Sequence, residues 1–193
     1  MRKNRISLSK SRKAAYKDAK RRTEYDADGR AVINMTVRDD SDFLSVYSER
    51  ETPFISSDVA EFIESSSHSL RPGQSLTLRI HSDCIDDGER QDYREGIQEY
   101  YSEKYIAAKR ELRFNLFAVI MLALAGIATL ILAFGVDNNI WSEVIDIAAW
   151  VFLWESVDIG VFKLREINAN RRRYLSYISM KVEYLPLSGE KKT

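Results

Sequence analysis

The sequence predicts an α+β membrane protein, in which a two-helix transmembrane hairpin is joined through a helical stalk to a small three-stranded α/β domain in the cytoplasm. Three observations lead to this fold class. Residues 114–134 form an apolar run without a charged residue. A second, mostly apolar run at 140–162 follows a loop of five residues, 135–139. Short segments in which apolar and polar residues alternate lie on both sides of the pair, a pattern typical of half-buried strands.

The first run is long enough to cross a bilayer. Its 21 residues match the roughly 20 helical residues that a hydrocarbon core of about 30 Å requires. Asn115 and Thr129 are its only clearly polar residues. Gly126 and the row Ala125, Thr129 and Ala133 place small residues on one face, which favours close helix contact in lipid. Such rows also arise because alanine is a good helix former, and both interpretations stay open.

The second run is predicted to be a span because the short loop must return the chain directly. It carries two pairs of acids at spacing i, i+3, namely Glu143 with Asp146 and Glu155 with Asp158. An acid inside a span costs about 2.5–3.5 kcal/mol and indicates a functional site by default. All four fall within one half of the helix surface, at about 100° per residue.

Folding the hairpin about its loop predicts the partners of these acids. Asp158 comes level with Leu116, within reach of Asn115 and of the long side chain of Arg113. Asp146 comes level with Thr129, whereas Glu155 has no partner in its own hairpin. The candidate site is a set of intramembrane polar contacts: Glu155, Asp158, Asp146, Asn115, Arg113 and Thr129. These contacts either fix the helix register by hydrogen bonds or form a path for protons or cations.

Basic residues set the predicted orientation. Lys and Arg occur shortly before the first run and shortly after the second, and the loop between the runs has none. The positive-inside rule therefore places both termini of this multi-pass protein in the cytoplasm. The net charge is zero, but residues 1–22 hold ten Lys or Arg and residues 23–93 hold sixteen acids. The basic start suits anionic lipid, and without interleaved aromatic residues it does not predict specific binding of nucleic acid.

The water-facing segments are predicted as one domain divided by the hairpin. Strands are expected at 31–38, 75–81 and 177–185, with a helix at 57–66 and Tyr174 packed near Tyr100 or Tyr101. The predicted segments are a basic flexible arm (1–30), a cytoplasmic α/β part (31–88), a stalk helix (89–113), two spans (114–134 and 140–162), a cytoplasmic helix with a closing strand (163–185) and a tail (186–193).

No motif in the sequence predicts an enzyme or a cofactor. There is no P-loop, zinc motif, nucleophile elbow or glycine-rich phosphate loop. Cys84 is the single cysteine and His68 and His81 lack metal-ligand spacing. The acids at 83, 86 and 87 are more typical of a turn and a helix cap than of a metal site.

The second run also carries a resemblance. The pattern W-x-x-x-W-E-x-x-D at residues 150–158, followed by the run Arg171 to Leu175, resembles a group of uncharacterised bacterial two-span membrane proteins over residues 90–184. The resemblance implies a membrane topology and a bacterial source, and with them a multi-pass protein of the bacterial cytoplasmic membrane. It implies no activity.

Two functions fit the sequence. The first is a non-enzymatic inner-membrane protein that self-associates and whose cytoplasmic domain binds a protein partner. The alternative is an oligomeric ion-conducting or membrane-perturbing effector gated by that domain.

Overall fold

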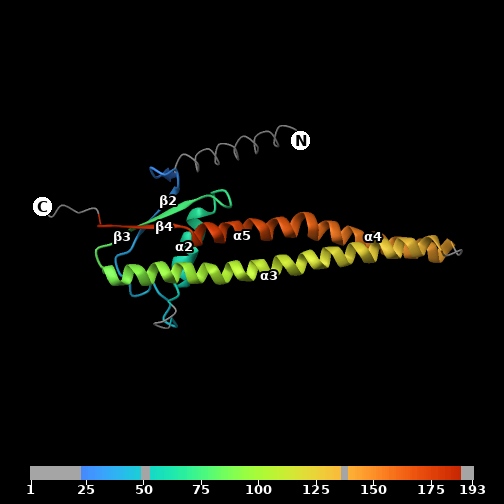
Figure 1. The fold of residues 1–193 in the computed structure, drawn as a ribbon, viewed down its shortest axis with the longest axis horizontal. Coiled ribbons are helices and arrows are strands. Elements are labelled where there is room, and N and C mark those ends of the chain that lie inside the picture. Colours follow the sequence, from blue (N-terminus) through green and yellow to red (C-terminus); the bar gives the residue numbers. More distant parts are fainter. Residues whose placement is uncertain (1–22, 49–52, 136–138, 188–193) are drawn as a thin grey trace, which may run out of the picture. The chain divides into compact units, whose positions relative to one another are not determined.

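The chain divides into two compact units. The computed structural model describes residues 23–48, 53–135 and 139–187. Within this part we call residues 23–103 and 173–187 the sheet unit, and residues 104–172 the helical unit. Helix α3, Asp87–Phe134, begins in the sheet unit and ends in the helical unit (Figure 1). The predicted continuity of the stalk with the first apolar run is therefore confirmed.

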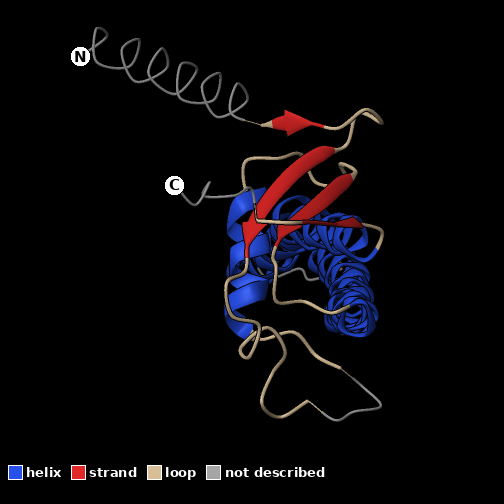
Figure 2. Ribbon diagram, turned by 90° about the vertical axis from the view of Figure 1, so that its left-hand side faces the viewer, coloured by secondary structure: helices blue, strands red, loops and turns tan. Residues whose placement is uncertain are grey.

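The sheet unit contains a mixed sheet of four strands in the order β1-β2-β3-β4. The strands are Glu24–Tyr25 (β1), Ala31–Thr36 (β2), Leu76–His81 (β3) and Lys181–Leu185 (β4). β1 is antiparallel to β2, whereas β2, β3 and β4 are parallel. Helix α2, Ser57–Ser67, connects β2 to β3. Figure 2 shows the helices of this unit on one face of the sheet. No described helix covers the other face, which we call the open face.

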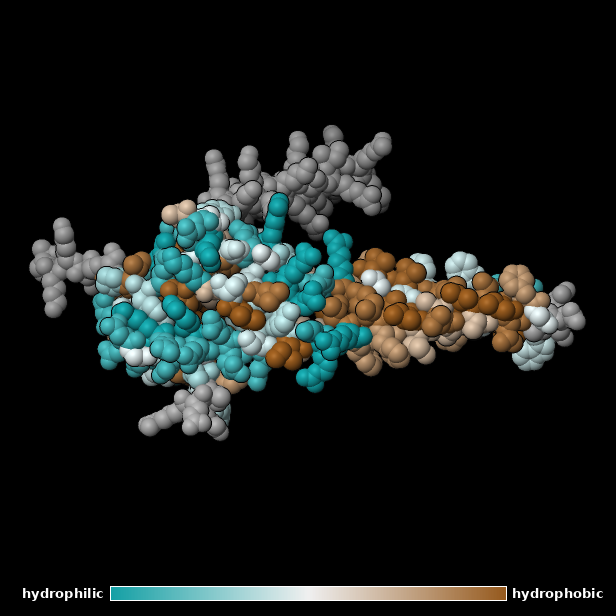
Figure 3. Space-filling view, in the orientation of Figure 1, coloured by the Kyte–Doolittle hydropathy of each residue, from teal (hydrophilic) through white to brown (hydrophobic). Residues whose placement is uncertain are grey.

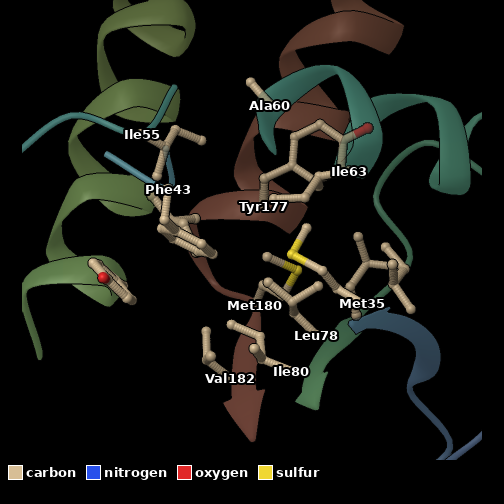
Figure 4. Packing of buried hydrophobic residues seen from close by; sticks show 14 of the residues in the cluster. Met35, Phe43, Ile55, Ala60, Ile63, Leu78, Ile80, Tyr177, Met180 and Val182 are labelled. Carbon is tan, nitrogen blue, oxygen red and sulfur yellow. The ribbon is translucent and has the colours of Figure 1, made fainter. Parts of the chain in front are cut away.

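The alternation along the strands decides which face is buried. Leu78 and Ile80 of the central strand β3 are fully buried. They lie with Met35 of β2 and Val182 of β4 beneath Ile63 of α2 (Figure 4). Burying one such side chain contributes about 1.5–3 kcal/mol, so this layer is the main source of stability in the sheet unit.

The prediction of three strands is wrong, because β1 pairs with β2 as a fourth strand. β1 lies inside the segment predicted to be a flexible arm; the first 22 residues of that arm are outside the described part. Two residues are too few to show an alternating pattern. A turn holds β1 in place: Gly29 has φ +74°, and Asp26 Oδ1 accepts the backbone N–H groups of Asp28 and Arg30 at 3.0 and 2.8 Å.

The closing strand also begins later than predicted. β4 begins at Lys181, while Tyr177 and Ile178 form the last turn of α5, Leu164–Ile178. The alternating pattern misleads here because Tyr174, Tyr177 and Ile178 also fit the i, i+3, i+4 spacing of one helix face. The helix places the Tyr177 hydroxyl 2.7 Å from Ser67 Oγ in the core.

Side-chain caps define where α2 and α3 begin. α2 begins at Ser57, as predicted, and Ser56 caps it through a bond from its first turn to the Ser56 hydroxyl. α3 begins at Asp87, and Glu89 Oε2 accepts the backbone N–H of Asp86 at 2.9 Å. The second interaction is half of a capping box.

The helical unit is an antiparallel helix pair. Beside the second part of α3 it contains α4 (Asn139–Asp158), one π-helical turn (Ile159–Lys163) and the first part of α5. Ser142 on α4 contacts Ala133, and Ser156 contacts Val119. Because one residue number rises as the other falls, the helices run in opposite directions. Residues 136–138 of the connecting loop lie outside the described part.

Among the described helices, α3 alone is long and apolar enough to cross a membrane by length and composition, and most of its apolar stretch is exposed. The predicted second span at 140–162 does not qualify by itself. Its helix α4 carries Glu143, Asp146, Glu155 and Asp158 within 20 residues. Figure 3 shows hydrophobic residues over much of the visible surface of the helical unit, whereas hydrophilic residues dominate the sheet unit.

Candidate functional site

The structure does not bring the predicted intramembrane partners together. Asn115 is buried, and its Nδ2 donates to the Glu111 carbonyl at 2.8 Å, one turn back on its own helix. Thr129 Oγ1 likewise donates to the Ala125 carbonyl at 2.8 Å. Both side chains therefore satisfy their donors within α3 and do not bond to α4.

The four charged residues of the predicted site do not lie between α3 and α4. Asp158 and Glu155 are exposed, Asp146 is half-buried and Arg113 on α3 is exposed. Within the described part of the chain, none of these four makes a hydrogen bond or an ion pair. The predicted contacts of Asp158 with Asn115 and Arg113, and of Asp146 with Thr129, are corrected accordingly.

The prediction of which residues of α3 and α4 lie at the same height along the helix pair is right. The prediction of which face of α4 turns toward α3 is wrong. Ser156 lies against Val119, as expected for a chain that folds back about residues 135–139. Asp158 follows Ser156 by two residues, which is about 200° around the helix. It therefore points away from α3.

Two serines, which the sequence analysis missed, bond across the helix pair. Ser142 Oγ donates to the Ala133 carbonyl and Ser156 Oγ to the Val119 carbonyl, both at 3.1 Å. Ala149, midway between the serines, is fully buried. The sequence feature that could have revealed these contacts is the spacing of seven residues between Ser142, Ala149 and Ser156. Helices that pack side by side over several turns have this repeat.

Gly126 lies in close contact with α4. A Cβ atom at this position would lie 2.7 Å from Leu153 Cγ and 3.3 Å from the Ala149 carbonyl oxygen. The predicted role of small residues in close contact is confirmed for Gly126 and for Ala133, which is buried. Ala125, in the same predicted row, is exposed.

In the sheet unit, tyrosines join α3, α5 and α2. Tyr101 is fully buried, and its hydroxyl donates to the Ala60 carbonyl at 3.3 Å. Its ring centroid is 6.4 Å from that of Tyr174 and 4.5 Å from that of Tyr177, which confirms the predicted proximity of Tyr174. Burial raises the pKa of the Tyr101 hydroxyl far above its usual value. This side chain therefore stays a neutral donor.

The open face of the sheet carries a network of paired charges. Arg79 contacts Glu24 at 2.9 Å and Glu183 at 3.4 Å, and Lys181 contacts Glu183 at 2.9 Å. Hydrogen bonds from Asn34 and Arg79 hold the pKa of Glu24 below its usual value. The bond from Lys181 does the same for Glu183. These groups satisfy one another, so the network resembles a stabilised sheet surface more than a reactive centre.

One small pocket opens between α2 and α5. Ser67, Arg173 and Tyr177 line it, and its volume of about 10 Å³ suits one water molecule. Arg173 Nη2 donates to the His68 carbonyl at 3.5 Å, at the C-terminal end of α2, where a helix dipole stabilises a cation. Arg173 therefore has one structural partner, at the end of α2, while its buried Nε has no hydrogen-bond partner among the described residues.

The described residues contain no group of three His, Cys, Asp or Glu side chains arranged to hold a metal. At the turn considered above, Asp83 Oδ1 accepts the backbone N–H of Leu187 at 2.9 Å. Cys84 is exposed, with Sγ 3.0 Å from Ser82 Oγ.

The chain matches no family model, no curated protein and no solved structure. The apolar stretch of α3 in the helical unit is largely exposed.

Proposed function

We propose that this chain is an integral protein of a bacterial inner membrane, in which α3 and α4 cross the bilayer as a hairpin. The exposed apolar half of α3 is the observation that supports this most strongly. Phe114, Ile131 and Phe134 are 72%, 67% and 88% exposed, and no charged residue lies between the first and the last of them. In water such a surface would drive aggregation, whereas in lipid it meets acyl chains.

The second crossing follows from the first. α4 lies against α3 over the whole length between the Ser142 and Ser156 bonds, so a bilayer around one helix also surrounds the other. The free energy of placing the acids of α4 in the bilayer is highest at its middle. Glu155 and Asp158 lie toward the same end as Lys163, where polar headgroups and local thinning lower the cost.

Charge orients the hairpin. Residues 114–162 contain no Lys or Arg, while Lys109, Arg110, Lys163 and Arg165 flank them. The positive-inside rule assigns these ends, and with them both termini and the sheet unit, to the cytoplasm.

The proposed role is non-enzymatic: the sheet unit binds a cytoplasmic protein partner, and the chain self-associates in the membrane. The open face of its sheet is covered by no described helix, which leaves that face accessible to a partner. The alternative is an oligomeric ion-conducting effector, which the exposed carboxylates of Glu155 and Asp158 favour. The mass of the oligomer in detergent discriminates between the two, because a dimer cannot surround a pore with Glu155 and a pentamer can.

Reporter fusions test the topology. Alkaline phosphatase, active only in the periplasm, is fused after Gly135 and, separately, after Thr193. Green fluorescent protein, fluorescent in the cytoplasm, is fused at the same positions. We expect phosphatase activity only at Gly135 and fluorescence only at Thr193. Phosphatase activity at Thr193 would contradict the hairpin, and extraction of the chain by alkaline carbonate would contradict the membrane placement.

A further inference from the structure

α4 carries a second row of residues with the spacing of a packing surface. The first row, through Ser142, Ala149 and Ser156, packs on α3. The second row lies on the opposite side of α4 and alternates steps of four and three residues. Its members on α4 are Val144, Ala148, Val151, Glu155 and Asp158, and Phe162 follows in the π-helical turn.

This second row is unpacked in a single chain. Val144, Val151 and Phe162 are 51%, 60% and 68% exposed. Glu155 and Asp158 are exposed as well and make no hydrogen bond within the described residues. The outer face of the apolar half of α3 differs, because it has no charged residue. In a bilayer, α3 can therefore face lipid without penalty, whereas the second row of α4 places two carboxyl groups in it.

We infer that the second row of α4 is the surface through which two copies of this chain pair in the membrane, with Glu155 opposite Glu155 across a two-fold axis. This inference rests on the proposed membrane placement. Steps of four and three residues are the spacing by which helices pack side by side. Ala148 and Val151 beside the acid are small enough for close approach.

A second copy fits this surface because the surface is self-complementary. A two-fold axis along the membrane normal brings each residue opposite itself at the same depth. A neutral carboxyl group has one O–H donor and a free acceptor oxygen, so two Glu155 side chains can satisfy each other. A different membrane helix would need a polar group at the same depth, and the test below detects such a partner by its mass.

Cysteine crosslinking tests the pairing. Cys84 is the single cysteine and is exposed, so Cys84→Ser provides a background without thiols. Val151→Cys in this background places a thiol on the second row, and Val157→Cys is the matched control. Both positions are valines of similar exposure, 60% and 53%, but Val157 lies one residue from Ser156 and to one side of the row. Membranes are oxidised and the disulfide-linked dimer is quantified on a non-reducing gel.

We expect several-fold more dimer with Val151→Cys than with Val157→Cys. In the Val151→Cys chain, Glu155→Gln keeps a donor and an acceptor and should preserve the dimer, while Glu155→Leu should reduce it several-fold. Equal crosslinking at both positions would overturn the inference. So would a crosslinked species with the mass of another protein, or no dimer from chains that resist carbonate extraction. Chains that carbonate extracts would instead refute the membrane placement, and this pairing with it.

Discussion

Adding one methyl group at Gly126 should weaken the helix pair. The new Cβ would lie 2.7 Å from Leu153 Cγ, while carbon atoms pack best at about 3.5–4.0 Å, so the helices must separate by about 1 Å. Overpacking of this kind costs about 1–3 kcal/mol, and the better helix propensity of alanine returns about 0.5–1 kcal/mol. We expect Gly126→Ala to destabilise the pair by about 1 kcal/mol, within a range of about 0–2.5 kcal/mol.

The assay is unfolding of the full chain in mixed micelles by increasing SDS, followed by circular dichroism. Gly160→Ala is the matched control, because a Cβ there lies 3.7 Å or more from Val119, an ordinary contact, and should be neutral or slightly stabilising. Leu153→Ala removes the atoms that clash, so the double variant should be more stable than the sum of the single effects by about 0.5–3 kcal/mol. Additive effects, or equal stability of Gly126→Ala and Gly160→Ala, would refute the close contact.

Two further predictions concern the sheet unit, both measured by urea unfolding of the full chain in detergent. Ser67→Ala leaves the buried Tyr177 hydroxyl without its partner and should cost about 1–3 kcal/mol. Tyr177→Phe removes that hydroxyl and should cost about 0.5–1.5 kcal/mol; the reverse order would contradict the bond. The folded-state pKa values of Glu24 and Glu183 are lowered, so their contribution to stability is present above their unfolded pKa and is lost as the pH falls below 4.5. Arg79→Met should make the urea midpoint less dependent on pH in this range, and an unchanged dependence would show that the network does not contribute.

Long and strongly periodic segments made much of the fold predictable. The strand pattern in β2 and β3 and the uninterrupted helical pattern of α3 were both confirmed. β1 was missed because two residues carry no period and its position depends on the Asp26 turn. The end of α5 was misassigned because Tyr177 satisfies a strand and a helix pattern equally, and only its contact with Ser67 in the core decides.

For the candidate site, the sequence predicted how far along α3 each residue of α4 lies. It did not predict which face of α4 turns toward α3. Loop length fixes how far α4 returns along α3, so the predicted level of Asp158 with Leu116 agrees within one residue with the bond between Ser156 and Val119. The rotation was inferred by assuming that acids in a span pair within their own hairpin. Hydroxyl groups provide a less costly contact, because Ser142 and Ser156 bond to backbone carbonyls without bringing a charge between the helices. Side-chain size and charge, which a hydropathy pattern ignores, therefore decide which face turns inward.

The position of β3 determines the order in which this protein can be completed during synthesis. β3 pairs with β2 on one side and with β4 on the other. β4 begins at Lys181, one hundred residues after β3 ends at His81. At about 5–20 residues per second, a ribosome needs roughly 5–20 s to synthesise the intervening chain, including both apolar helices. During this interval one edge of β3 has no partner and the layer around Ile80 is incomplete. Translation products that stop before β4 would retain this open edge, which is a ready template for aggregation and a feature that quality-control proteases could recognise.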